Sequence, residues 1–229
     1  MSALRDAEVK SFVKQVGSLV SHYNELKLAI HNKKNEASLQ NELAVQLSLS
    51  ISVQWESFIH DLIVAYVLTD PSRAFESLEN RARKSIQGKF GPVTEKCFTF
   101  CQPTGLNREK IQELLDPKGW NITAHNAGEL ANRSNELLAS RYAMRFSLDA
   151  GNSEFYDYVV ALRNYLSHRS TGARTTFKNS INGLSVAKNL PLKANIGKTD
   201  FYLKSLAAPK TISRVEYIAN RLKEIATIL

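Results

Sequence analysis

The sequence predicts an all-α protein, in which a bundle of helices carries a helical insertion and a basic loop before its last helix. Apolar residues recur at intervals of three and four along most of the 229 residues, which is the period of helices that bury one face. Helix-capping residues precede several of these stretches, and glycine or proline follows them. The 43% of apolar residues suffices for a substantial core, so we expect residues 1–229 to form a single domain.

Two long helices are expected first. Apolar residues recur at helical period over residues about 3–31 and again over about 36–68. The short polar turn His31–Asn35 between them suits an antiparallel pair. Pro71 then fits the first turn of a third helix, which extends to about Gln87.

The middle of the chain is expected to form the insertion, at about 88–148. Glycine and proline residues make 88–106 a predicted loop. A short helix over Asn107–Leu115, capped by Asn107, and another over about Ala127–Arg141 complete the insertion. The last helix, at about Lys210–Leu229, should close the bundle.

The helix after the insertion carries the candidate site. It should begin at Gly151-Asn152-Ser153 and end before Gly172. Its apolar stripe consists of Phe155, Tyr158, Val159, Leu162, Tyr165 and Leu166. In the stretch ALRNYLSHRS near its end, Arg163, Asn164 and His168 fall mostly outside this stripe, so their side chains should reach the surface.

Arg163, Asn164 and His168 combine the groups that cleavage of a phosphodiester without a metal requires. A guanidinium binds phosphate oxygens, an amide donates hydrogen bonds, and an imidazole takes up or releases a proton. Asn164 and His168 share one face of the helix, and Arg163 lies about 140° around the axis from His168. We therefore expect these three residues to form a catalytic site on a surface edge rather than in a buried pocket.

An Arg followed by a polar residue and, four to six positions later, a His on a helix of an all-α domain resembles the signature of the HEPN superfamily. Arg163, Asn164 and His168 match this signature, and Trp55-Glu56-Ser57-Phe58-Ile59 resembles the second helix of the branch called RiboL-PSP-type HEPN. The similarity covers roughly residues 36–68 and 150–172. Members of the superfamily are helical bundles, commonly dimeric, and many are metal-independent endoribonucleases of toxin, anti-phage or RNA-processing systems.

The resemblance implies an endoribonuclease reaction on RNA. His168 would take the proton from a ribose 2′-hydroxyl, which attacks the adjacent phosphorus, and Arg163 would stabilise the added negative charge. Asn164 would orient the imidazole or donate to the phosphate, and the products would be a 2′,3′-cyclic phosphate and a 5′-hydroxyl. An antitoxin or another defence-system protein is an implied partner. Ser170 replaces the Tyr that antitoxins of the nucleotidyltransferase type modify, so we do not expect regulation by that modification.

Other residues on the two resembling helices have two interpretations each. Glu56 and Asp61 either orient Arg163 across the bundle or are ordinary exposed helix charges. Tyr156 and Tyr165 could stack on nucleobases, although Tyr165 falls on the apolar stripe. Trp55 lies on the stripe of its own helix, so we expect it in the core.

Basic residues are concentrated after the motif. From Arg163 to Arg214 there are ten Lys or Arg and one acidic residue, whereas the rest of the chain holds 20 basic and 21 acidic residues. A segment of this charge attracts a polyanion, and we expect Arg169, Arg174 and Lys178 to bind RNA. The alternative interpretation is a solvated loop at about 172–209, because glycine and proline residues punctuate it.

Other types of site have little support in the sequence. Cys97 and Cys101 are too few for a zinc site without distant histidines, so we expect neither a metal nor a cofactor. Gly197-Lys198-Thr199 lacks the earlier glycine of a P-loop, because Leu192 stands at that position. The amino terminus is charged where a signal peptide is apolar, and the longest apolar run, Leu62–Leu68, is too short to span a bilayer. We expect a cytoplasmic protein without membrane contact.

A second function, from a different class, also fits the sequence. A catalytically inactive helical module that binds RNA or a partner protein would have the same fold and the same basic segment. A helical scaffold with no role in nucleic-acid binding would leave the basic segment unexplained.

We expect the active species to be a homodimer. One helix edge offers a single imidazole, whereas transesterification needs a base and an acid on opposite sides of the phosphorus. Two protomers about a two-fold axis would supply both in a composite site, with the partner's His168 as the acid. Light scattering should find a particle near twice 25.7 kDa, and activity per protomer should fall on dilution. A monomer that stays fully active would contradict the composite site.

Overall fold

A computed structural model describes residues 3–119, 122–183, 199–207 and 211–229, and within these ranges the chain is helical with no β-strand. The predicted all-α class is confirmed. An isolated antiparallel bridge between Leu206 and Ser213 is the one extended pairing in the described part of the chain. None of the helices in these ranges combines the length and apolar character that crossing a membrane requires.

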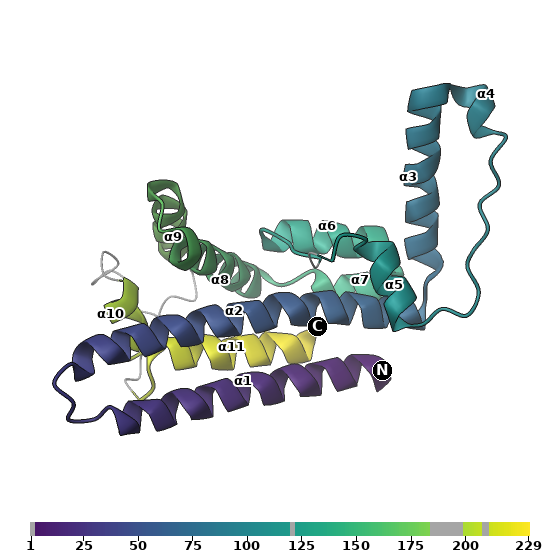
Figure 1. Ribbon diagram of the computed structural model, residues 1–229. Coiled ribbons are helices and arrows are strands. Elements are labelled where there is room, and N and C mark those ends of the chain that lie inside the picture. Colours follow the sequence, from purple (N-terminus) through teal and green to yellow (C-terminus); the bar gives the residue numbers. More distant parts are fainter. Residues whose placement is uncertain (1–2, 120–121, 184–198, 208–210) are drawn as a thin grey trace.

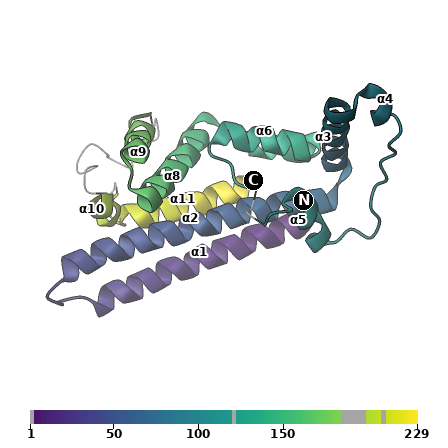
Figure 2. The ribbon, with the colours of Figure 1, turned by 45° about the horizontal axis from the view of Figure 1, so that its top comes forward.

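The first two helices form the long antiparallel hairpin that the sequence predicts (Figure 1). They are α1 (Ala3–Ala29) and α2 (Glu36–Thr69). The last helix, α11 (Arg214–Ile228), packs along both, and Figure 2 shows the two chain ends toward the same end of this three-helix layer. The predicted start of the last helix at Lys210 is too early, because a capping box at Ser213 begins it.

The motif helix, α8 (Ala150–His168), lies against α2 on the other side from α1 (Figures 1 and 2). Asp149 caps it by accepting a hydrogen bond from the backbone of Asn152, so α8 begins one residue before the predicted start. Trp55 of α2 is 2% exposed and its ring lies 6.1 Å from that of Tyr156 of α8, between ring centroids. The expected core position of Trp55 is confirmed, and this aromatic contact fixes the two helices that surround the candidate site.

The third helix stands away from the bundle at the end of α2 (Figure 1). It is α3 (Ser72–Phe90), and the short α4 (Pro92–Glu95) lies at its tip. The predicted loop over 88–106 is therefore wrong at its start. The third helix continues past its predicted end at about Gln87 to Phe90, and Pro92 begins a further helical turn.

The return segment leads to α5 (Arg108–Leu115), which Asn107 caps as predicted. The guanidinium of Arg108 bridges Glu8 of α1 and Asp61 of α2, with N–O distances of 2.6 Å to each. This pair of contacts anchors the insertion to the hairpin.

The second predicted helix of the insertion is interrupted. The structure has α6 (Ala127–Leu137), then α7 (Ser140–Ala143) and a 3-10 turn η1 (Met144–Phe146), where the sequence predicts one helix to Arg141. The interruption follows from Leu138, whose backbone is extended and whose side chain is buried in the core.

The predicted basic loop at about 172–209 is largely wrong where the structure describes it. Two helices occupy the described part, α9 (Thr171–Gly183) and α10 (Thr199–Lys204), and residues 184–198 and 208–210 lie outside the described residues. The buried ring of Phe177 stacks on Tyr165 at 5.6 Å between centroids, with an interplanar angle of 8°. This contact packs α9 on α8, so the chain after the motif is held beside the site.

Candidate functional site

A cavity of about 430 Å³ lies where the sequence places the catalytic residues. Its walls come from four parts of the chain: α2, the segment before α6, α8 and α9. Their main polar contributions are Glu56, Thr123, His125, Arg163, Asn164, His168 and Thr176. The three residues were expected on an open surface edge, and this expectation is wrong. Residues of α9 and of the segment before α6 lie beside α8 and enclose a cavity with it.

Arg163 is fixed by an ion pair with Glu56 across the α8–α2 contact. Its Nε lies 3.2 Å from Glu56 Oε1, and its Nη2 donates to Glu56 Oε2 at 3.4 Å. Its Nη1 donates to Asn164 Oδ1 at 3.2 Å. The two charged side chains are 34% and 30% exposed, so the pair sits at the rim of the core, within reach of a ligand. Of the two interpretations of Glu56, the structure supports the orienting one.

These contacts leave defined donors for a ligand. A guanidinium carries five N–H groups, and the contacts above use three, so two remain without a partner among the described residues. The oxygen of Asn164 already accepts from Arg163, which leaves its amide nitrogen as the donor. The Arg163–Asn164 pair therefore presents N–H groups, which suit an anion such as a phosphate.

His168 is the last residue of α8, and its side chain is exposed. The next residue, Arg169, has a left-handed backbone with φ of 53° and caps the helix, so α8 ends earlier than the predicted stop at Gly172. Ser170 then accepts a hydrogen bond from the backbone of Ala173 at 3.2 Å, at the start of α9. This tight turn places α9 close to His168.

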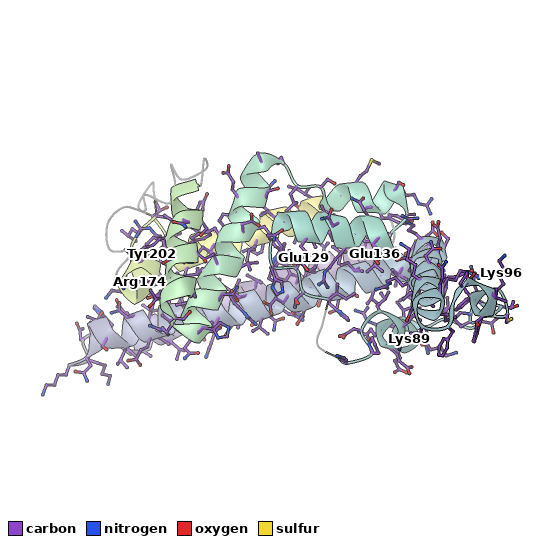
Figure 3. The ribbon with its side chains drawn as sticks, turned by 90° about the horizontal axis from the view of Figure 1, so that it is seen from above. Lys89, Lys96, Glu129, Glu136, Arg174 and Tyr202 are labelled. Atoms are coloured by element: carbon purple, nitrogen blue, oxygen red, sulfur yellow. The ribbon has the colours of Figure 1, made fainter. Side chains whose placement is uncertain are left out.

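The three residues predicted to bind RNA do not join the cavity. Arg169 lines a different cavity, of about 550 Å³, between α1 and α2. Arg174 and Lys178 are exposed and lie four residues apart on α9, and Figure 3 shows Arg174 on the opposite side of α8 from Glu129 of α6. The structure thus brings Arg163, Asn164 and His168 together, whereas the three further basic residues lie outside the lining of their cavity.

His125, which no sequence pattern pointed to, also lines the same cavity, from the segment 122–127. Besides the cap of α6 at Asn126, four hydrogen bonds hold this segment. The backbone N–H of Ile122 donates to His60 Nδ1 (3.0 Å), and Tyr156 Oη–H donates to the carbonyl of Ala124 (3.2 Å). The backbone N–H of His125 donates to Glu129 Oε2 (2.8 Å), and that of Ala127 donates to Asp157 Oδ1 (2.7 Å). The capping residue Asn126 marks the start of α6 in the sequence. No local sequence signal shows that the residues before α6 contact α8.

Two further expectations are corrected. Asp61 does not orient Arg163, because it pairs with Arg108. Tyr156 and Tyr165 are buried, at 3% and 9% exposure, so neither ring is open to stacking on a nucleobase. Burial also raises the pKa of Tyr156 far above its ordinary value, with a further contribution from the nearby charge of Glu56.

Comparison with known proteins gives no match: no family model, curated protein or solved structure is significantly similar to this chain.

Cys97 and Cys101 are both exposed thiols. No group of three His, Cys, Asp or Glu side chains gathers within the described ranges in a way that could hold a metal ion.

The buried His60 holds the segment before α6 in place only when its imidazole is neutral. His60 accepts a hydrogen bond from Ile122 through Nδ1, which a protonated imidazole has no lone pair to do. Burial is the main cause that lowers the pKa of His60, and Arg108 lowers it further, while the carboxylates of Asp61 and Asp116 act in the opposite direction.

We expect the free energy of unfolding to decrease as the pH falls below about 6.5, where a histidine of the unfolded chain takes up a proton that folded His60 resists. The contribution of His60 should be complete above that pH and lost as the pH falls toward its lower folded-state pKa. Urea unfolding between pH 7 and 5 should show a shallower dependence for His60→Gln than for the natural chain, with exposed His22→Gln as the control. Parallel curves for His60→Gln and the natural chain would contradict this role.

Proposed function

We propose that this chain is a metal-independent endoribonuclease that cleaves RNA by attack of its own 2′-hydroxyl. The observation that carries the proposal is the single cavity lined by Arg163, Asn164 and His168, with the guanidinium held by Glu56. The resemblance of these residues to the HEPN signature supports the same reaction.

The groups in the cavity fit the two tasks of this reaction. The two remaining N–H groups of Arg163 and the amide of Asn164 would bind non-bridging oxygens of the scissile phosphate and stabilise the charge that develops on them. His168, on the same helix face as Asn164, would take the proton of the 2′-hydroxyl. Arg174 and Lys178 on α9, and Arg169 beyond the helix end, would contact phosphates that flank the cleavage position.

The biological role proposed with this activity is that of a HEPN toxin, an anti-phage effector or an RNA-processing enzyme. It includes a cytoplasmic location, a homodimer and, in a toxin or defence system, a partner protein. The biological roles and the partner protein are what the resemblance to the HEPN signature implies, and all of these statements stay predictions.

A catalytically inactive binding module is the second candidate, and one observation favours it. Three of the five N–H groups of Arg163 are used within the chain, as in a purely structural ion pair. The two candidates differ in whether RNA is cut, which the following experiments decide.

Purified protein should cleave labelled single-stranded RNA in EDTA and should leave DNA of the same sequence intact, because DNA lacks the nucleophile. A substrate with one 2′-deoxyribose should resist cleavage at that position alone. Mapping of the ends should find 2′,3′-cyclic phosphate and 5′-hydroxyl termini. Loss of activity in EDTA that a divalent ion restores would refute the mechanism, and tight RNA binding without cleavage would favour the inactive module.

Substitution of the named side chains should separate catalysis from folding. We expect Arg163→Ala and His168→Ala each to abolish cleavage while changing the free energy of unfolding by no more than about 1 kcal/mol, because both side chains are partly or fully exposed. Arg163→Lys should also be poorly active, since an ammonium cannot reproduce the planar fork. Arg73→Ala and His22→Ala, at exposed positions outside the cavity, serve as matched controls. Unfolding of either alanine variant, or full activity of both, would favour the structural interpretation.

A further inference from the structure

A second imidazole reaches the cavity from outside the motif helix. His125 lines the cavity together with His168, although it belongs to the segment 122–127 before α6 rather than to α8. One chain therefore supplies two imidazoles and one guanidinium to the same cavity. This set contains a second proton-transfer group, which a single helix edge lacks.

The backbone around His125 is held in place by the elements that carry the motif. His60 of α2 and Asp157 of α8 accept hydrogen bonds from the backbone of the segment 122–127, and Tyr156 of α8 donates one to it. Glu129 of α6, labelled in Figure 3, accepts from the backbone N–H of His125 through Oε2, and its Oε1 pairs with Arg133 at 2.7 Å. Because α2 and α8 also carry Glu56 and Arg163, the backbone of His125 is held in place relative to the helices that carry the ion pair.

The ring of His125 makes no direct contact that fixes it in the described part of the chain, and its interaction with the nearby carboxylate of Glu129 is electrostatic. The contact with Glu129 uses the backbone N–H, which any residue except proline would supply. The side chain is exposed, and no hydrogen bond or ion pair of its ring is found among the described residues. Both ring nitrogens are therefore available to a ligand in the cavity.

We propose that His125 is the general acid of the cleavage reaction, an inference that rests on the proposed ribonuclease function. His168 takes the proton of the 2′-hydroxyl as the 2′-oxygen bonds to phosphorus, and the bond from phosphorus to the 5′-oxygen breaks. Protonated His125 gives its proton to that 5′-oxygen. The products are the 2′,3′-cyclic phosphate and the 5′-hydroxyl, and exchange of one proton each with water restores both imidazoles.

This assignment makes the site complete within one chain. In the composite site expected from the sequence, the acid is the partner's His168, and His125 has no role in proton transfer. The two arrangements differ in a measurable way, because only the one-chain site loses its acid when His125 is replaced.

The test compares RNA with a matched RNA whose scissile 5′-oxygen is replaced by a bridging sulfur, which leaves without being protonated. We expect His125→Ala to slow cleavage of the oxygen substrate by about 10²–10⁴-fold, the usual contribution of a general acid, and to cleave the sulfur substrate at nearly the natural rate. His168→Ala should be slow on both substrates, because it lacks the base. His22→Ala should match the natural chain on both, and His125→Gln should repeat the behaviour of His125→Ala with a side chain of similar size.

Each other outcome has a distinct meaning. If the natural chain cleaves RNA in EDTA and His125→Ala does so equally fast, the assignment of His125 is overturned while the ribonuclease function stands. If His125→Ala and His125→Gln stay folded but are equally slow on both substrates, His125 does not act as the acid. If sulfur rescues His168→Ala instead, the two roles are reversed and the proposal is wrong as stated. If the natural chain does not cleave RNA, the proposed function fails and the inference fails with it.

Discussion

The ion pair between Arg163 and Glu56 joins α8 to α2 and fixes the guanidinium on which the candidate site depends. Both side chains are about one-third exposed, and ion pairs of this exposure contribute at most about 1 kcal/mol to folding. Buried contacts such as that of Trp55 with Tyr156 therefore hold the two helices together. The effect of the ion pair is on orientation, because Glu56 occupies one edge of the guanidinium and, with Asn164 on Nη1, leaves two N–H groups to a ligand.

The fold was predictable wherever a helix buries one face and carries its own start signal. The hairpin of α1 and α2, the cap of α5 at Asn107 and the stripe of α8 all depend on residues close together in sequence. The sequence also holds a stripe in α9, since Ala173, Phe177 and Ile181 are spaced by four. Glycine and basic residues in the same stretch favoured a loop over this weak stripe. The helix α9 is stabilised by stacking of Phe177 on Tyr165 of another helix, which a local pattern does not show.

The candidate site was predictable to the extent that it lies on one helix. Spacing along α8 identified Arg163, Asn164 and His168, and resemblance to a family suggested Glu56 or Asp61 as partners of the arginine. The sequence does not show that Arg108 takes Asp61, because α5 reaches that position only in the folded chain. His125 was not predictable at all, since its place beside α8 depends on contacts with distant residues such as His60 and Tyr156.

The structure also shows that not all basic residues of the segment from Arg163 to Arg214 are available to a polyanion. Counting charges overstates the positive field at the candidate site, because Arg163 is paired with Glu56 and Arg214 is buried against Tyr202 and Ser205. The exposed Arg174 and Lys178 of α9 are not among the residues that line the cavity, and interactions between solvent-exposed charges are screened within about 8 Å at physiological salt. In the proposed ribonuclease they would act on strand binding, which salt weakens. Bond cleavage would then depend on the imidazoles and on the guanidinium that Glu56 holds in place, so the two parts of the site would respond differently to salt and to substitution.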